Sequence, residues 1–197
     1  MITVAIARQL AASVKALLVL TLVAGLLYPA AILAIGLVVP GQANGSLIEV
    51  DGTVVGSSLL GQAAGGPQWF QARPSASDHA GDTSGGSNLG PSSEELASQV
   101  SERGAALREA NPDAPASIPA DALTASASGL DPHISPEYAA YQVPRVAAAR
   151  GMSAAQVQRL VAAHTEHAVL GFLGQDRVNV TELNVSLATA DASTGSQ

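Results

Sequence analysis

The sequence predicts an α+β fold, with a single N-terminal transmembrane helix followed by one extracytoplasmic mixed α/β domain. Three observations predict this class. An uncharged apolar run covers residues 16–39, both helix-like and strand-like apolar spacings occur within 40–190, and the part beyond the run has the size of one compact domain. The ends are assigned as a cytoplasmic N-terminus, 1–15, and a disordered tail, 191–197.

The apolar run is long enough to cross a bilayer. As a helix, about 24 residues span roughly 36 Å, more than a hydrocarbon core of ~30 Å. Membrane helices tolerate Gly25 and Pro29. A cleaved signal peptide is the alternative, but its apolar region would be shorter and would end at a small-residue cleavage site, which is not evident here. Ala30, Ala34 and Gly36 are small residues that would let another helix approach closely.

The charges that flank the run predict its orientation. Arg8 and Lys15 precede it without an acidic residue, whereas Glu49 and Asp51 are the first charges after it. The positive-inside rule therefore places the N-terminus in the cytoplasm and the domain outside. The exported part holds seven arginines and all 16 acidic residues, a net charge of −9. We expect a single-pass protein of the inner (plasma) membrane that contacts lipid and binds no nucleic acid.

The domain begins with a predicted β-hairpin over residues 46–60. The dipeptide Asp51-Gly52 favours a type I′ turn between two short apolar runs. Residues 68–93 are rich in glycine, serine and proline, so they predict a long loop. A helix is expected next, over 92–110, because Ser92 or Ser93 can cap it and two glutamates lie in its first turn.

Two further helices and a strand are predicted towards the C-terminus. One helix follows a Ser135 cap and stops at Gly151, with Pro144 predicted to kink it or to break it into two pieces. The next begins at Ser153 with the spacing of a capping box. Residues 177–187 alternate apolar and polar side chains with one change of phase, which predicts a strand with a bulge.

Serine, aspartate and histidine lie close together in the stretch that contains Ser126, Ser128, Asp131 and His133. A membrane-anchored hydrolase that uses Ser126 or Ser128 with His133 is therefore an alternative function. Catalytic triads are usually assembled from distant parts of a chain, however, whereas these residue types also form local turns. The chain also has no G-x-S-x-G nucleophile motif and no cysteine, so we favour a structural loop.

The glycine-rich stretch "SGGSNLG" (84–90) resembles a phosphate-binding loop. It lacks the lysine that the Walker pattern requires, since the chain has no lysine after Lys15. We interpret it as a loop with left-handed backbone positions, packed against a partner or against its own domain. His164 and His167 have a spacing that could hold a metal, but no third ligand is evident, and we assign no metal site.

Several stretches together resemble one protein family. They are, in order, "GSLI", "VVGSSLLGQ", "WFQARPSA", "SGGSNLGPSS", "ASASGLDPHISPEYAAYQVPRVAAARG" and "VNVTELNVSLA", after an N-terminal apolar span. Each is weak alone, but their order and spacing are specific and cover nearly the whole chain. The sequence thus resembles the C subunit family of the bacterial potassium-transporting Kdp ATPase.

This resemblance implies an accessory subunit without catalysis of its own. In that family a channel-like A subunit binds potassium, a P-type B subunit hydrolyses ATP, and a small F peptide completes the complex. The C subunit is described as a catalytic chaperone that raises the ATP affinity of the pump subunit. No cofactor is assigned to this chain, because ATP and potassium would act through the complex. Since the predicted topology separates the domain from cytoplasmic ATP, we expect an indirect effect and a domain near the outer potassium entrance.

The stretches that carry the resemblance also supply candidate partner contacts. Arg73 is the only basic residue between Lys15 and Arg103, and it is either a structural ion-pair partner or an interface residue. The full candidate set is Arg73, Ser84, Gly85, Gly86, Asn88, Asp131 and His133.

Overall fold

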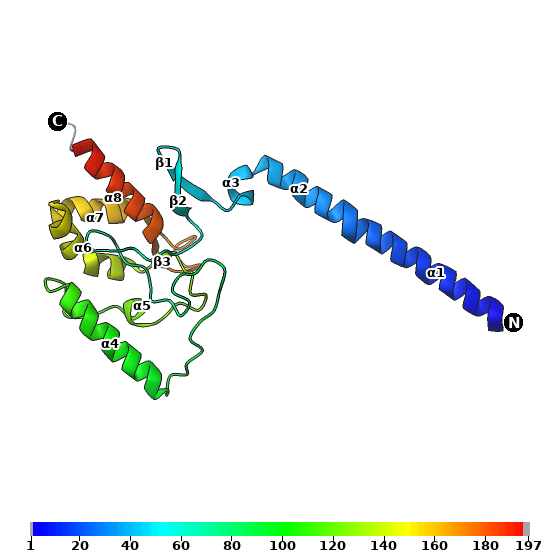
Figure 1. The fold of residues 1–197 in the computed structure, drawn as a ribbon, viewed down its shortest axis with the longest axis horizontal. Helices are drawn as coiled ribbons and strands as arrows, with labels where there is room; N and C mark the ends of the chain where they lie inside the picture. The colour runs from blue at the N-terminus through cyan, green and yellow to red at the C-terminus, as the bar shows by residue number, and fades with distance from the viewer. Residues whose placement is uncertain (1, 195–197) are drawn as a thin grey trace. The chain divides into compact units, whose positions relative to one another are not determined.

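The computed structural model describes residues 2–194, with side chains described for 3–190. It consists of two compact units, one up to Ser46 and one from Leu47 onwards. One long helix is followed by a mixture of helices and short strands (Figure 1), which confirms the predicted α+β class.

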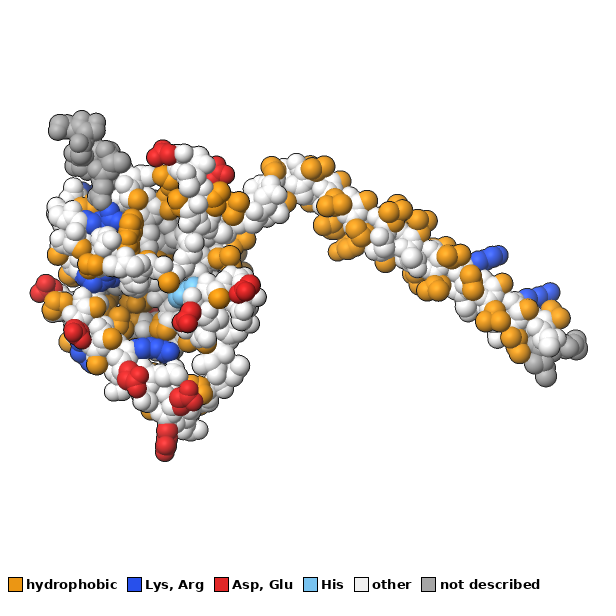
Figure 2. Space-filling model, in the orientation of Figure 1, with side chains coloured by type: hydrophobic (Ala, Val, Ile, Leu, Met, Phe, Trp, Pro, Cys, Tyr) orange, Lys and Arg blue, Asp and Glu red, His pale blue; other side chains and the backbone are white. Residues whose placement is uncertain are grey.

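The first unit is a long helix with a short helical turn after it. α1 (Ile2–Leu22), the π-helical turn η1 (Val23–Leu27) and α2 (Tyr28–Val38) are continuous, and α3 (Pro40–Ala43) follows. Within the described residues, Thr3–Val38 is the one helix long and apolar enough to cross a membrane. Hydrophobic side chains cover it, and basic side chains appear only towards its N-terminal end (Figure 2).

Pro29 accounts for the π-helical turn. Its ring nitrogen has no hydrogen, so it cannot donate to the carbonyl of Gly25 as an α-helical residue would. The N–H of Tyr28 instead donates to the carbonyl of Val23, five residues earlier. The helix therefore passes the proline by widening one turn, which is a common use of single π-turns.

The three small residues expected to aid helix packing differ in their surroundings. Ala30 and Ala34 are both exposed and about one turn apart, so they share a face. Gly36 is half-buried, and a Cβ atom added there would lie 3.4 Å from the Cβ of Ala43. Gly36 thus makes room for α3, and only the two alanines stay available for a neighbouring helix.

The second unit begins with the predicted hairpin. β1 (Leu47–Val50) pairs antiparallel with β2 (Thr53–Ser57), and Val50 lies opposite Thr53. The two turn residues have positive φ, 50° at Asp51 and 76° at Gly52. A type I′ turn needs both left-handed positions, and this dipeptide tolerates them.

The long predicted loop is confirmed over 68–93, where no helix or strand forms. Side-chain amides nevertheless hold its first part. The Phe70 N–H donates to Asn184 Oδ1 at 2.8 Å, and Asn184 Nδ2 donates to the Phe70 carbonyl at 2.9 Å. Gln142 makes the same pair of bonds with Gln71: the Gln71 N–H donates to Gln142 Oε1 at 2.7 Å, and Gln142 Nε2 donates to the Gln71 carbonyl at 3.1 Å. These amides satisfy a buried backbone as a neighbouring strand would.

The next two helices agree with the sequence, with one correction. α4 (Glu94–Ala110) starts at the Ser93 cap, and α6 (Pro136–Arg150) starts at the Ser135 cap and ends at Gly151, where φ is 65°. α6 is a single helix through Pro144, so the predicted break is wrong. Buried residues on both sides of the proline, among them Tyr138 and Val146, hold the helix to the core.

The predicted strand over 177–187 is wrong beyond its first three residues. β5 (Arg177–Asn179) ends there, and α8 (Val180–Thr194) begins. Val180, Leu183 and Leu187 are buried at helical spacing, so the apparent change of phase marks the start of a helix. Asn179 Oδ1 accepts a hydrogen bond from the Glu182 N–H, as an N-cap does.

The helix α8 also reaches into the predicted disordered tail. Residues 191–194 are helical, so the predicted disordered tail, 191–197, is wrong over these four residues. Residues 195–197 lie outside the described residues. β5 is the central strand of a small antiparallel sheet, between β3 (His133–Ile134) and β4 (Thr165–Glu166).

The remaining helices close the second unit around one core. α5 (Ala120–Leu123) is a single turn after α4, and α7 (Ala154–Ala163) contacts both α6 and α8 (Figure 1). The predicted capping box joins Ser153 and Gln156. The core includes Phe70, Tyr138, Val143, Val146, Val157, Val178, Leu183 and Leu187. Loop, helices and sheet therefore contribute to a common interior, and the functional candidates lie around it.

Candidate functional site

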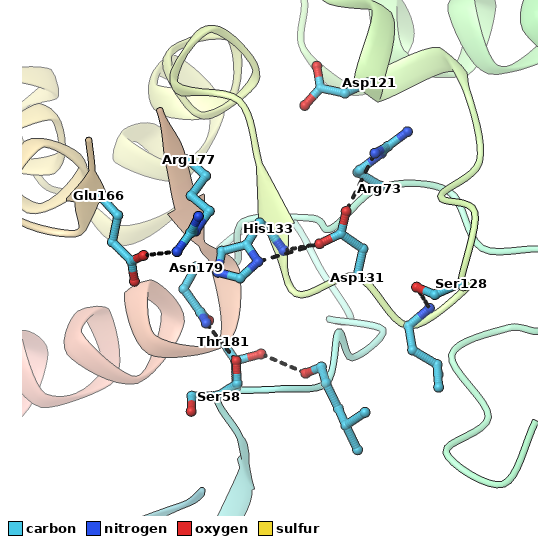
Figure 3. Close-up of polar contacts among 12 residues, drawn as sticks. Ser58, Arg73, Asp121, Ser128, Asp131, His133, Glu166, Arg177, Asn179 and Thr181 are labelled. Carbon is cyan, nitrogen blue, oxygen red and sulfur yellow. Dashed lines mark hydrogen bonds and ion pairs between the residues drawn. The ribbon is translucent and has the colours of Figure 1, made fainter. Parts of the chain in front are cut away.

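Asp131 is the centre of the polar cluster that the sequence singles out. Its carboxylate lies 3.4 Å from the Arg73 guanidinium and 3.5 Å from Nδ1 of His133. The His133 backbone N–H also donates to Oδ1 of Asp131 at 3.0 Å. Figure 3 shows the aspartate between the two basic side chains, so three of the predicted partner contacts come together.

Local chain geometry explains this arrangement. Asp131 precedes Pro132, and its carboxylate accepts a hydrogen bond from the backbone two residues later, which is an Asx turn. Arg73 comes from the loop that Gln142 and Asn184 anchor to the core. Its guanidinium also donates to the carbonyls of Thr124 and Ala125, both at 3.5 Å.

The pKa of Asp131 is lowered from its ordinary value. Burial acts to raise this pKa, but hydrogen bonds from the His133 side chain and backbone, and then the positive charge of Arg73, outweigh it. The Nε atom of Arg73 is buried and has no hydrogen-bond partner within the described part of the chain. The cluster thus favours the charged form of Asp131, while Nε of Arg73 is left without an acceptor among the described residues.

The glycine-rich loop packs against its own domain, beside residues 127–129. The Gly85 N–H and the Ser84 hydroxyl both donate to the carbonyl of Ser128, at 2.8 and 3.0 Å. A Cβ atom at Gly86 would lie 3.0 Å from the carbonyl oxygen of Ala127. Asn88 has a φ of 54° and an exposed side chain, which is therefore accessible to a partner.

Gly61 is a residue of this site that sequence analysis missed. Its N–H donates to the carbonyl of Leu130 at 2.8 Å, and an added Cβ would clash with the carbonyl oxygen of Asp131. The segment after β2 therefore passes directly over the Asp131 turn. The stretch "VVGSSLLGQ" contains this glycine, but nothing in its spacing reveals which distant backbone it approaches.

An open cleft of about 930 Å³ extends from the Asp131 cluster. Asp121 lines the cleft and accepts hydrogen bonds from the Ser135 N–H and hydroxyl, at 2.7 and 2.9 Å. Arg177 also lines the cleft and lies beside Glu166 (Figure 3). The charged lining of the cleft is of both signs and consists of Arg73, Asp121, Asp131, His133, Glu137, Asp176 and Arg177. The sequence did not identify Asp121, Glu137, Asp176 or Arg177, because they come from separate elements.

The structure does not assemble the alternative hydrolase. Within the described residues, no hydrogen bond joins His133 to Ser126 or Ser128, and the Ser128 hydroxyl instead accepts from the Leu130 N–H at 3.1 Å. Ser126 is only 3% exposed. A nucleophile needs a base within hydrogen-bond reach and access to substrate, and these serines lack that combination.

The two histidines of the possible metal motif have separate partners. Nε2 of His164 contacts the hydroxyl of Ser186 at 2.8 Å, whereas Nδ1 of His167 contacts Asp176 at 2.8 Å. No group of three or more metal-ligating side chains occurs among the residues described. Both histidines therefore take part in local structure.

Comparison with known proteins gives a consistent result. The family model for KdpC, the c chain of the K⁺-transporting ATPase, matches residues 10–189. A potassium-transporting ATPase KdpC subunit from Kineococcus radiotolerans is 53% identical over 185 residues, covering 93% of this chain and 94% of that protein. A KdpC subunit from Geobacter sulfurreducens is 50% identical, covering 92% and 98%. One from Sorangium cellulosum is 53% identical, covering 87% and 92%.

The match includes both the apolar helix and the domain that carries the cleft, so it concerns the whole architecture rather than one motif. The relatives are named as subunits of a transport complex and not as enzymes in their own right. The chain belongs to the KdpC family, the c chain of potassium-transporting ATPases.

Proposed function

We propose that this chain is a non-catalytic accessory subunit that stabilises an ATP-driven, high-affinity potassium uptake complex. In this proposal, it assembles with a channel-like A subunit, a P-type B subunit and a small F peptide. It acts as a catalytic chaperone that raises the affinity of the B subunit for ATP. The observation that carries the proposal is the apolar helix Thr3–Val38, whose most apolar part is not buried within the described structure, in a chain whose domain carries a mixed-charge cleft.

The helix supports membrane assembly. None of its most apolar part is buried against the rest of the chain, so lipid or other membrane helices must cover it. Ala30 and Ala34 give a face on which another helix can approach closely. We propose that this face contacts the channel-like subunit.

The cleft supports an interface on the outer side of the membrane. Charges of both signs line it, and complementary charges give an interface its register and its choice of partner. Arg73, Asp131 and His133 line the cleft, and among the residues that the structure describes Nε of Arg73 has no acceptor. The net charge of −9 beyond the helix also raises the local cation concentration near the potassium entrance, although salt screens it beyond about 8 Å.

The effect on ATP is indirect in this proposal. The charges around the helix place the domain outside the membrane, whereas the B subunit hydrolyses ATP in the cytoplasm. The chain then favours the ATP-binding state through its membrane contacts, as a coupling free energy between separate sites. Arg73 and the Asp131 turn therefore contact protein and not nucleotide.

The topology has a direct test. A periplasm-sensitive reporter is fused after residue 60 and, in a second chain, at Gln197. Both fusions should be active, because such a reporter works only outside the cytoplasmic membrane, and an inactive fusion at residue 60 would overturn the orientation. Activity at neither position would show that the domain is not exported.

The proposed interface has a matched pair of variants. Glu137→Lys reverses a charge in the cleft, whereas Glu109→Lys makes the same change on an exposed part of α4 outside it. We expect Glu137→Lys to reduce co-purification of the other subunits at least about tenfold, as loss of roughly 1.4 kcal/mol would. Equal recovery with both variants would place the interface elsewhere.

The chaperone role is tested with the purified complex. ATPase activity is measured with and without this chain over a range of ATP concentrations. Absence of the chain should raise the KM for ATP while potassium still stimulates turnover. An unchanged KM in a complex that has lost this subunit would leave assembly as its only role.

A further inference from the structure

The apolar turn of residues 168–174 is a second surface of the domain. It borders the cleft at Asp176, which lines the cleft and accepts a hydrogen bond from the Ala168 N–H. Four large apolar side chains stand exposed on the turn: Val169, Leu170, Phe172 and Leu173 are 61%, 81%, 77% and 62% exposed. Isolated exposed apolar residues are ordinary, but a contiguous group marks an interaction site.

The backbone holds these side chains outward. Val169 and Leu173 exchange two hydrogen bonds, each 3.0 Å long, which close the turn. Leu170 lies in the left-handed region with a φ of 58°, followed by Gly171 at 78°. A leucine costs about 1–2 kcal/mol in this conformation, and exposure to water adds to that cost. Such strain persists where a function requires the geometry.

The charged side chains next to the apolar turn have hydrogen-bond or ion-pair partners within the domain. Asp176 accepts hydrogen bonds from His167 Nδ1 at 2.8 Å and from the Ala168 N–H at 2.9 Å. Arg177 donates to Glu166 at 2.6 Å. The turn itself carries no charged residue. It can therefore enter an apolar medium without bringing an unpaired charge with it.

The short linker between the apolar helix and the domain keeps the lipid surface within reach of the domain. The apolar helix ends at Val38, and the second unit begins at Leu47. The intervening residues, 39–46, span at most about 28 Å when fully extended, and α3 shortens that reach. Once the helix is in a bilayer, the domain is tethered close to the lipid surface at a high effective concentration.

We propose that the apolar turn inserts into the outer face of the bilayer that holds the helix, as a second membrane contact. The side chains favour lipid over a protein partner. Leucine and valine are under-represented among the residues that dominate protein interfaces, where tryptophan, tyrosine and arginine prevail, and the turn contains none of those three. Insertion depends on apolar burial and not on anionic lipid, since the domain is acidic.

The test uses the full chain alone in vesicles of phosphatidylethanolamine and phosphatidylglycerol. Because the chain has no cysteine, Phe172→Cys provides a single site for an environment-sensitive fluorophore, and Ala106→Cys on exposed α4 is the matched control. Lipids with a quencher near the headgroup report depth. We expect quenching at position 172 to be about fivefold stronger than at 106, because interfacial elements lie roughly 5–10 Å below the surface.

A second variant separates insertion from misfolding. Leu170→Asp, added to the labelled Phe172→Cys chain, places a charge on the turn at a side chain that is 81% exposed. Lipid quenching should fall to the level of position 106. Ala106→Asp in the same labelled chain should leave it unchanged. Equal quenching at 172 and 106, or quenching that survives Leu170→Asp, would overturn the proposal.

A protein partner gives a different result. If the label at 172 is shielded from an aqueous quencher only when the other subunits are present, and lipid quenchers have no effect, then the turn is a protein contact and the proposal fails. These outcomes do not depend on the ATP measurement, so the apolar turn and the proposed accessory function can fail separately.

Discussion

The carboxylate of Asp131 joins two segments that are far apart in the sequence, and its removal should be measurable. Asp131→Ala takes the acceptor from Arg73 and from the His133 N–H. We expect the free energy of unfolding to fall by about 1–3 kcal/mol, because half-buried donors lose their partner. Urea titration followed by fluorescence of Trp69, the single tryptophan, measures the change. Asp82→Ala, at an exposed aspartate, should change it by less than about 0.5 kcal/mol.

The same carboxylate predicts a pH dependence. The pKa of Asp131 in the folded protein lies below its ordinary value of 3.8. Its contribution to stability is therefore complete above that ordinary value and is lost as the pH falls through the lower folded-state pKa. The difference in unfolding free energy between the wild type and Asp131→Ala should therefore shrink as the pH falls below 3.8. A gap that widens in acid would contradict this assignment.

Gly61 allows two backbones to approach where no other residue can. Gly61→Ala puts a Cβ into the carbonyl oxygen of Asp131, and we expect a loss of about 1–3 kcal/mol in unfolding free energy. Gly65→Ala is the matched control, since nothing lies within 4 Å of its added Cβ. Thermal unfolding of both variants measures the difference. Equal stability would show that the segment after β2 can shift away from Asp131 without a loss in unfolding free energy.

At the scale of elements, the sequence correctly predicted the turn and the helix caps, which depend on residues close together in the chain. The Asp51-Gly52 turn and the caps at Ser93, Ser135 and Ser153 are confirmed because each depends on residues a few positions apart. The strand over 177–187 failed because Val178 and Val180 alternate like a strand while Leu183 and Leu187 already follow a helical period. Only the packing of α8 on the core distinguishes the two.

The anchored loop segment shows what no local signal reveals. Gln142 reads as an ordinary helix residue, yet its amide is buried and bonds both backbone groups of Gln71. Gln142→Leu should accelerate hydrogen exchange of the Gln71 amide by about tenfold or more, since a bond worth about 1 kcal/mol and its buried partner are lost. Gln158→Leu, the same change on exposed α7, should not. Exchange measured by NMR would contradict this if both variants match the wild type.

For the whole molecule, the sequence predicted one apolar span, one mixed domain and the family. It did not predict the cleft, because Asp121, Glu137 and Arg177 meet there only through the sheet and helix packing. Of the candidate contacts, Arg73, Asp131 and His133 are brought together, whereas the glycine-rich loop lies against 127–129. Their contact with other subunits stays a prediction.

The apolar helix predicts how membrane attachment responds when an arginine is introduced into it. Leu27→Arg places a cation near the middle of the apolar run, where it costs about 2.5–3.5 kcal/mol. The chain should then become extractable by alkaline carbonate. Leu37→Arg, near the end of the run, should stay in the membrane, because the arginine can extend to the interface. If both variants remain bound to the same extent, the helix does not span at this depth.

The widened turn at Val23–Leu27 has a consequence for every neighbour of this helix. Each extra residue carried in a wide turn rotates the following side chains by about 100° relative to a regular helix. A stripe of side chains that begins before Val23 therefore does not continue into Ala30 and Ala34. One straight neighbouring helix can therefore follow only half of the rod, and lipid or a second helix must cover the other half.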